Sequence, residues 1–191
     1  MEKQAIRALA RERLRRITPD DRAVYSRTVT QRIIDTLAQT GAGTVMLFAS
    51  LADEPDLVEV DRWCRLNGRR RAYPICPPRG APMEAVVSTD DLGRFARGPY
   101  GFRIPERAEP VEPGAIDIVV TPGLAFDPAC RRVGRGKAYY DRFFACPECR
   151  ARRVGAAFDC QVFERVPTSD HDVPLDMLIT ERRVLVRGGK G

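Results

Sequence analysis

The sequence has few aromatic residues, a single histidine and no long apolar run. Aromatic residues make up 7% of its 191 residues, and His171 is the one histidine. A closed zinc site with four ligands would therefore have to collect cysteines from scattered positions. The most apolar stretches, at 45–49 and 116–120, are far shorter than the roughly 20 residues that span a bilayer, so no membrane partner is expected.

The N-terminal residues lack the composition of a secretory signal, because charge begins at Glu2 and no apolar stretch follows. We therefore expect a cytoplasmic protein whose six cysteines are free thiols. Cys146 and Cys149 have the Cys-x-x-Cys spacing of zinc knuckles and redox motifs. The pair stands alone in the sequence, so incidental thiols at the end of a helix are the favoured interpretation.

The sequence carries a surplus of positive charge, with 32 Lys and Arg residues against 26 Asp and Glu and a net charge of +6. Such a surplus favours an anionic partner: a phosphorylated ligand, a polycarboxylate or a nucleic acid. A solvated Arg-rich surface has the same composition. The basic residues are spread from Lys3 to Lys190 rather than clustered, and RNA readers usually expose aromatic residues beside a basic patch. A nucleic-acid-binding module is therefore kept only as an alternative, and no nucleic-acid partner is expected.

Helical and strand patterns alternate along the chain. Apolar residues three and four apart predict a helix over residues 2–17, and the segment from Thr18 to Asp21 has the capping hydroxyl, proline and acids of a second helix start. A third helix is expected from Leu57 and a fourth from about Gly136. Short apolar runs predict strands at 44–49, 71–75, 116–121, 154–158, 177–180 and 184–186, with 83–87 a weaker candidate in the Pro- and Gly-rich middle, 77–113.

This alternation predicts one α/β domain over residues 1–191, a three-layer α/β/α sandwich with a mainly parallel sheet. In such sheets, ligands bind at the carboxyl ends of the strands. Two loops are expected there. One covers residues 50–55 and carries Asp53 and Glu54, and the other begins at Pro122 after the 116–121 strand.

The segment from 132 to 141 is the most unusual in the chain, because two glycines alternate with cations just before an expected helix. Glycines let the backbone approach a ligand with its N–H groups turned inward, and the helix start adds positive charge. Arg132, Arg135 and Lys137 add full charges, so the segment predicts phosphate binding. It is neither a P-loop nor a dinucleotide fingerprint, because Ala138 follows the lysine and Tyr139 replaces the third glycine.

Two further groups of charges fit a phosphate ligand. Asp141 lies one helical turn after Lys137 and could hold Mg²⁺ beside bound phosphates, or form a surface pair with that lysine. In the first helix, Lys3, Arg7 and two later arginines stand four residues apart and repel one another. They form either a solvated face or a row whose first members reach a bound anion.

These segments together resemble one known family. Residues 121–127 (Thr-Pro-Gly-Leu-Ala-Phe-Asp), followed by 134–141, are similar to the signature of the 5-formyltetrahydrofolate cyclo-ligase family, also named methenyltetrahydrofolate synthetase. Three weaker stretches match that family in the same order: the basic helix 3–7, the loop 50–56 and the closing motif that runs from 171 to 181. The resemblance thus covers nearly the whole chain.

The resemblance implies an ATP- and Mg²⁺-dependent enzyme that converts 5-formyltetrahydrofolate to 5,10-methenyltetrahydrofolate. ATP would phosphorylate the formyl oxygen, the neighbouring nitrogen would attack the activated carbon, and ADP and phosphate would be released. The implied partner is 5-formyltetrahydrofolate, with or without a polyglutamate tail. The protein itself is expected to be a monomer or a weak oligomer.

The resemblance also implies residue roles. Arg135 and Lys137 would be catalytic, Asp141 and Asp176 would hold Mg²⁺, and Ala49, Glu54 and Tyr139 would contact folate. The implied ATP-binding residues are Lys3, Arg7, Arg132, Val133, Gly134, Arg135, Gly136, Lys137, Ala138, Tyr139 and Tyr140.

Two positions depart from the family pattern. Ala138 stands where the family has glycine, and Ala49 stands where it tends to have a bulkier apolar residue. Ala138 favours an alternative, a nucleotide-binding relative without catalytic turnover. The intact Glu54, Arg135 and the two expected metal ligands argue against that alternative. His171 is expected to make hydrogen bonds in a loop rather than to act in catalysis.

Overall fold

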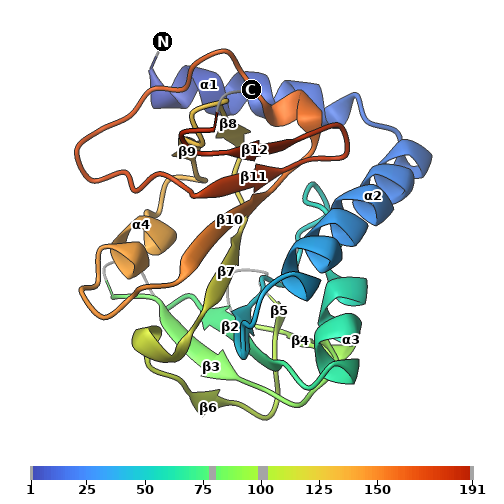
Figure 1. The fold of residues 1–191 in the computed structure, drawn as a ribbon. Coiled ribbons are helices and arrows are strands. Elements are labelled where there is room, and N and C mark those ends of the chain that lie inside the picture. The colour runs from blue at the N-terminus through green and yellow to red at the C-terminus, as the bar shows by residue number, and fades with distance from the viewer. Residues whose placement is uncertain (1, 78–80, 99–102, 190–191) are drawn as a thin grey trace.

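The computed structural model describes residues 2–77, 81–98 and 103–189, and within them the strands form one eight-stranded sheet and two two-stranded sheets. The large sheet lies at the centre of the molecule (Figure 1). From β11 to β2 its neighbouring strands are parallel, whereas β12, β3 and β6 pair antiparallel at the two edges. The mainly parallel sheet is therefore confirmed. In spatial order the strands are β12 (Val184–Val186), β11 (Met177–Ile179), β10 (Arg152–Ala156), β7 (Ile118–Thr121), β1 (Thr44–Met46), β2 (Arg70–Ile75), β3 (Glu84–Val87) and β6 (Glu109–Pro110).

The start of two α-helices follows from local sequence and backbone conformation. In α2 the Thr18 hydroxyl accepts a hydrogen bond from the backbone N–H of Asp21 at 3.1 Å, and Pro19 occupies the first turn, as expected. The fourth helix begins at Tyr139, later than expected, because Gly136 and Ala138 have φ angles of 112° and 51° that an α-helix does not contain. The described helices are α1 (Lys3–Arg15), α2 (Pro19–Ala38), α3 (Val58–Leu66) and α4 (Tyr139–Phe144).

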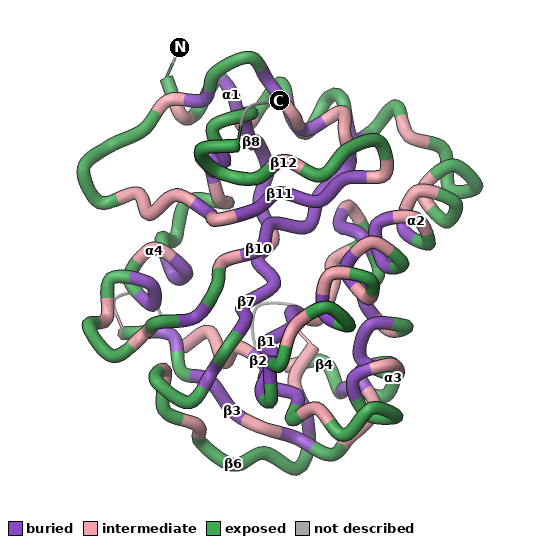
Figure 2. The backbone as a smooth tube through the Cα atoms, viewed as in Figure 1, coloured by how far each residue is buried: buried purple, intermediate pink, exposed green. Residues whose placement is uncertain are grey.

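Alternate residues of the central strands face different helices, which produces the expected three layers. Val45 and Val120 pack in the core beneath α2 and α3, whereas Met46 and Val119 pack in a second core with α4. Figure 1 shows α2 and α3 along one side of the sheet and α4 on the other, and Figure 2 shows the strands between them as buried. Every residue of β1 and β7 is buried, and burial on both faces is typical of a parallel sheet covered by helices.

A short hairpin that the sequence patterns did not reveal leads into the phosphate segment. It consists of β8 (Ala125–Phe126) and β9 (Arg132–Val133), and α1 packs over it through Ile6, Ala10 and Leu14. Its turn is held by Asp127, which is fully buried and accepts hydrogen bonds from the backbone N–H groups of Ala129, Arg131 and Val166. The buried carboxylate therefore fixes where Arg132 begins the segment.

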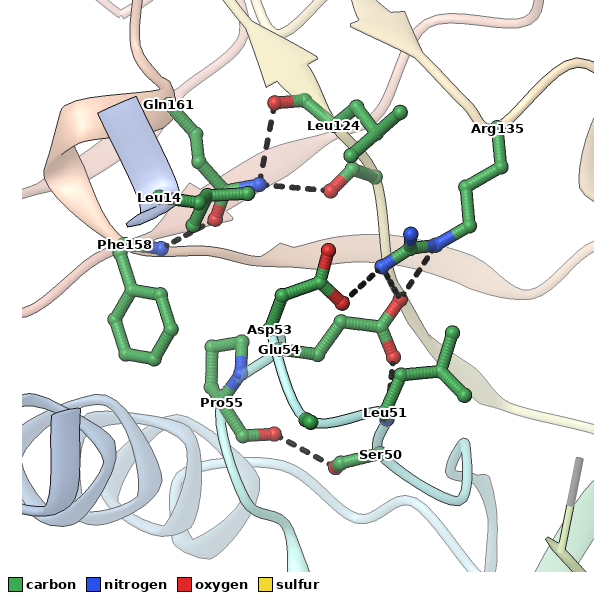
Figure 3. Close-up of polar contacts among 12 residues, drawn as sticks. Leu14, Ser50, Leu51, Asp53, Glu54, Pro55, Leu124, Arg135, Phe158 and Gln161 are labelled. Carbon is green, nitrogen blue, oxygen red and sulfur yellow. Dashed lines mark hydrogen bonds and ion pairs between the residues drawn. The ribbon is translucent and has the colours of Figure 1, made fainter. Parts of the chain in front are cut away.

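Gln161 ties the loop after β7 to the loop after β10 (Figure 3). Its side-chain amide donates to the carbonyls of Gly123 and Leu124 at 2.8 and 3.2 Å and accepts from the N–H of Phe158 at 2.8 Å. Gln161 is 1% exposed, so these bonds satisfy buried backbone groups that would otherwise be costly. The carboxyl end of β7 is thereby held in one position.

The remaining elements differ from expectation mainly at their ends. The strand expected at 154–158 begins earlier, at Arg152, and 83–87 is confirmed as β3. Parts of the unassigned middle, 78–80 and 99–102, lie outside the described residues. Among the described residues, no helix is long and apolar enough to cross a bilayer. The other elements are β4 (Ala96–Arg97), β5 (Arg103–Ile104) and the 3-10 helices η1 (Leu92–Arg94), η3 (Pro113–Ala115) and η4 (Asp159–Gln161).

Candidate functional site

A cavity of about 330 Å³ lies at the carboxyl ends of β1 and β7. Phe48 and Ala49 follow β1 along one wall, and Pro122 and Gly123 follow β7 along another. The position agrees with the rule that ligands bind beyond the carboxyl ends of parallel strands. The cavity brings together the predicted site residues Ala49, Glu54, Arg132, Gly134, Arg135, Lys137, Ala138, Tyr139, Tyr140 and Asp141.

Arg132 is the most deeply buried cation of the phosphate segment. Its Nη2 donates to Oδ2 of Asp141 at 2.9 Å and its Nη1 donates to the carbonyl of Pro122 at 3.2 Å. Nε is buried without a hydrogen-bond partner among the described residues. A Cβ at Gly134 would lie 2.8 Å from Nη1, so glycine at this position leaves room for the guanidinium. Arg132 therefore retains an unused donor beside the cavity.

Ala138 adopts the left-handed conformation, with φ 51° and ψ 27°. This conformation brings the Cβ of an L-residue too close to the following carbonyl and costs about 1 kcal/mol or more, whereas glycine adopts it readily. Alanine at this position therefore strains the backbone where glycine would not. Ala138 also lines the cavity, so its methyl group occupies space there.

Replacing Ala138 with Gly should raise the free energy of unfolding by about 1 kcal/mol, because the left-handed strain is removed. Activity should hold or rise. Urea denaturation and the initial rate would measure the two effects. Ala145→Gly is the matched control. Ala145 has the ordinary right-handed φ of −77°, so the same change there should lower the free energy of unfolding. A large loss of activity in Ala138→Gly would mean that the loop has been rebuilt around alanine.

The first two cations of α1 reach the site, and the later ones do not. Nε of Arg7 donates to the carbonyl of Gly134 at 2.8 Å, so Arg7 lies against the phosphate segment. Nζ of Lys3 bonds both carboxylate oxygens of Asp172, at 2.6 and 2.5 Å. Arg11 and Arg15 are exposed. The row of like charges is thus a solvated face at one end and part of the site at the other.

The part of the closing motif that contacts Asp141 is next to Asp172 in sequence rather than next to Asp176. The backbone N–H of Val173, the next residue after Asp172, donates to Oδ1 of Asp141 at 3.4 Å. Burial raises the pKa of Asp172, but hydrogen bonds from Lys3 and the Ser169 backbone outweigh it and hold the pKa below its ordinary value. Asp172 is therefore an ionised carboxylate paired with Lys3, and the residue that follows it contacts Asp141.

Asp176 lies elsewhere, at the amino end of β11. It accepts three hydrogen bonds from Arg153, one from the backbone N–H and two from the guanidinium at 2.7 and 3.0 Å. It lines a separate depression with Arg150 and Arg152. The prediction that Asp176 completes a site with Asp141 does not agree with this placement. The closing motif contains acids at both 172 and 176, and spacing alone did not distinguish them.

Within the described ranges, no three Asp, Glu, His or Cys side chains gather as a metal site. Asp141 lines the cavity, and Asp172 is linked to it only through the Val173 backbone, so a metal held by these carboxylates would need oxygens from another molecule. Two other residues singled out in the sequence do not line the cavity. His171 is exposed. Cys146 lies just after α4, and its thiol donates to the Glu148 carboxylate at 2.8 Å.

Glu54 and Arg135, which were expected to contact different ligands, are bonded to each other (Figure 3). Oε1 of Glu54 accepts from Nη2 and Nε of Arg135 at 2.9 and 3.1 Å, and Oε2 accepts from the Leu51 backbone N–H at 3.0 Å. Nη2 of Arg135 also donates to Asp53 at 2.5 Å. Burial raises the pKa of Glu54, and Arg135 opposes that rise. The sequence placed Asp53 in this loop but gave it no role.

Two tyrosines of α4 line the inner part of the cavity. The Tyr139 hydroxyl donates to the carbonyl of Pro77 at 2.6 Å, and Nζ of Lys137 lies 5.9 Å from the centre of its ring. The Tyr140 hydroxyl is buried without a partner among the described residues, and burial raises its pKa well above the ordinary value. Val133 belongs to the core under α1, so only its backbone can face a ligand.

Comparisons with known proteins agree on one family. The model of the "5-formyltetrahydrofolate cyclo-ligase family" matches residues 1–181. The 5-formyltetrahydrofolate cyclo-ligase of Mus musculus is 25% identical over 94% of this chain and 93% of its own, and that of Escherichia coli K12 is 26% identical over 92% and 98%.

Solved structures give the same result for the fold. The 5,10-methenyltetrahydrofolate synthetase of Aquifex aeolicus has a TM-score of 0.83 and 27% identity, and the match covers 100% of this chain and 96% of that one. A synthetase from Mycoplasma pneumoniae has a TM-score of 0.78 over 95% and 99% of the two chains; at 20% identity it supports the fold alone.

Proposed function

The chain belongs to the 5-formyltetrahydrofolate cyclo-ligase family, and on that basis we propose how its residues divide the work of the reaction. The enzyme is a ligase of folate one-carbon metabolism that converts 5-formyltetrahydrofolate to 5,10-methenyltetrahydrofolate, and the family implies that it depends on ATP. The roles of individual residues, of Mg²⁺ and of the glutamate tail are the proposals that follow.

One observation carries the residue assignment: the phosphate segment and Glu54 line the same cavity. The terminal phosphoryl group of ATP moves to the formyl oxygen, which turns a poor leaving group into a good one. The neighbouring nitrogen of the folate then attacks the formyl carbon, the ring closes and phosphate leaves. Such a transfer requires both substrates side by side, and it depends on positioning and charge neutralisation more than on a protein nucleophile.

Cations from three elements surround the expected phosphate position. Arg7 from α1 and Arg132 from β9 would hold the phosphates together with backbone N–H groups of the segment. Arg135 and Lys137, which line the cavity, would neutralise the charge on the transferred group. The unpartnered Nε of Arg132 supports an anionic ligand at this point, because a buried donor without an acceptor is costly.

We assign Mg²⁺ to Asp141 and Asp172. The residues fit this ion, because Mg²⁺ takes one or two carboxylates and completes its shell with phosphate oxygens and water. Both carboxylates are paired with cations of the predicted ATP site, Arg132 and Lys3, which phosphates would attract in their place. When bound, the ion supplies charge neutralisation at the phosphate oxygens.

For folate, Glu54 would accept hydrogen bonds from the N–H groups of the pterin ring, with Ala49 and Tyr139 as walls. The cavity shares Leu51, Glu54 and Arg103 with a larger depression that continues along α2. The Arg103 residue is half-buried, and its side chain has no hydrogen bond or ion pair among the described residues. We therefore place the glutamate tail in this depression, with its carboxylates near Arg103.

Replacing Arg103 with Met should raise KM for 5-formyltetrahydrofolate about tenfold and leave kcat within a factor of two, because the lost contact is remote from the reacting atoms. The rise should be larger for a polyglutamylated substrate. Arg97→Met is the matched control, since Arg97 pairs with Arg103 across β4 and β5 but lines neither depression. Equal effects of the two variants would contradict this path for the tail.

A direct assay tests the proposal as a whole. Purified protein is mixed with 5-formyltetrahydrofolate and MgATP, and the near-ultraviolet absorbance of the methenyl product is followed. Controls omit ATP or add a chelator. Product that requires ATP and metal supports the assignment. Absence of product from folded protein would point to a relative without turnover, with Ala138 as the first residue to revert.

A further inference from the structure

We propose that an exchange of partners between Glu54 and Arg135 couples the two substrate sites, so that ATP and folate each bind more tightly when the other is present. The inference rests on the roles proposed above for these two residues. It goes beyond them because each role so far concerns one substrate alone. The observation behind it is that the two groups are bonded to each other.

The bond occupies the groups that the substrates need. Arg135 donates two N–H groups to Oε1 of Glu54, at 2.9 and 3.1 Å, and the Leu51 N–H takes Oε2 (Figure 3). A pterin ring must displace the guanidinium to reach Oε1, and a phosphate must draw the guanidinium away from the carboxylate. Each substrate, binding alone, therefore has to break the Glu54–Arg135 ion pair. Once one substrate has broken it, the second binds without that free-energy cost.

Burial makes this break costly when ATP binds alone. The Glu54 side chain is 6% exposed, so a phosphate that takes Arg135 leaves a buried carboxylate whose one remaining donor, within the described part of the chain, is the Leu51 N–H. Removing one partner of a buried ion pair is strongly unfavourable, because the other charge is left uncompensated. Folate removes this penalty, since the pterin N–H groups replace the guanidinium at Glu54.

Folate binding alone is less costly, because Asp53 keeps hold of Arg135. Nη2 donates to Asp53 at 2.5 Å, and the Asp53 side chain is 34% exposed and does not line the cavity. The guanidinium can therefore leave Glu54 and remain at the cavity, poised for a phosphate. Asp53 is in this view a positioning residue, which acts through Arg135 rather than by contact with a substrate.

The coupling must be reciprocal. If folate tightens ATP binding by some factor, ATP must tighten folate binding by the same factor, because both are parts of one thermodynamic cycle. Couplings of this kind typically change affinity by about 5- to 150-fold, and a single buried ion pair places the expected value at about tenfold.

The test measures binding without turnover, by calorimetry with a non-hydrolysable ATP analogue and Mg²⁺. In the natural protein, saturating 5-formyltetrahydrofolate should lower the Kd of the analogue about tenfold, and the analogue should lower the Kd of folate by an equal factor. In Glu54→Gln, the analogue alone should bind about tenfold more tightly than to the natural protein, because a phosphate that draws Arg135 away no longer leaves a buried carboxylate uncompensated. In this variant, 5-formyltetrahydrofolate should change the Kd of the analogue little, when it is added at a concentration that saturates the variant by its own measured Kd.

Simple damage to the fold would not make a substitution of Glu54, a residue assigned to folate, strengthen the binding of the nucleotide. Glu112→Gln, at an exposed glutamate with no ion pair among the described residues, is the matched control and should bind the analogue like the natural protein. Equal affinities for the analogue with and without folate in the natural protein would overturn the inference, and this measurement needs no variant to fold. A protein with normal turnover and no coupling would overturn only this inference, whereas a protein without turnover would count against the proposed roles themselves.

Discussion

Replacing Arg135 with Met should lower kcat/KM for ATP-dependent ring closure about a thousandfold. An arginine that neutralises a phosphoryl group in transfer is worth about 10³-fold or more in rate. Arg135 lines the cavity with Lys137, and its side chain is 31% exposed, so solvent cannot fully replace its charge. Arg11→Met is the control, because Arg11 is an exposed arginine of α1 that does not line the cavity.

The same variant should show a distinct dependence of stability on pH. Burial already raises the pKa of Glu54 above 4.5, and the loss of Arg135 removes the largest opposing effect. A carboxyl group with a raised folded-state pKa favours the folded protein below its unfolded pKa, and this contribution is lost as pH rises through the folded pKa. The deficit in unfolding free energy relative to the natural protein should therefore be small near pH 4.5 and grow towards pH 7.5, as urea denaturation at the two pH values would measure. A deficit that does not change with pH would mean that Glu54 is not left uncompensated.

Asp141→Asn and Asp172→Asn should each lower the rate at saturating ATP about 10²-fold and raise the Mg²⁺ concentration needed for half-maximal rate. A bound metal contributes several kcal/mol of charge stabilisation, and each 1.36 kcal/mol is a factor of about ten in rate. The Val173 N–H, which follows Asp172 in the chain, donates to Asp141 and so links the closing motif to α4. Magnesium titration of initial rates, at fixed ATP, is the measurement.

Asp176→Asn is the matched comparison, because it changes the same residue type in the same motif. It should leave the magnesium requirement unchanged and lower the free energy of unfolding, since the bonds from Arg153 lose their charged acceptor. A shift in the magnesium requirement for Asp176→Asn, without one for Asp172→Asn, would restore Asp176 as the ligand. Circular dichroism of each variant separates loss of metal from loss of fold.

The sequence by itself determined the features that depend on near neighbours. Thr18 and Pro19 predict the start of α2 because a cap and its N–H partner lie three residues apart. The phosphate segment was visible because its glycines, cations and helix start occur within ten residues. The buried strands were recognisable as short apolar runs, and from their alternation with helices the α/β sandwich followed. The motifs that resemble the family also lie within single loops.

Only the tertiary structure decided which distant groups meet. Glu54 and Arg135 are separated by 81 positions in the chain, and their bond exists because the loops after β1 and β9 reach the same end of the sheet. Asp172 meets Lys3 across 169 positions, whereas Asp176, four residues later, has already passed to the opposite end of the parallel strands. Residue spacing reports which side chains share a face of one element, but long-range contacts depend on how the elements pack, and that packing decides which acid, which cation and which loop complete the site.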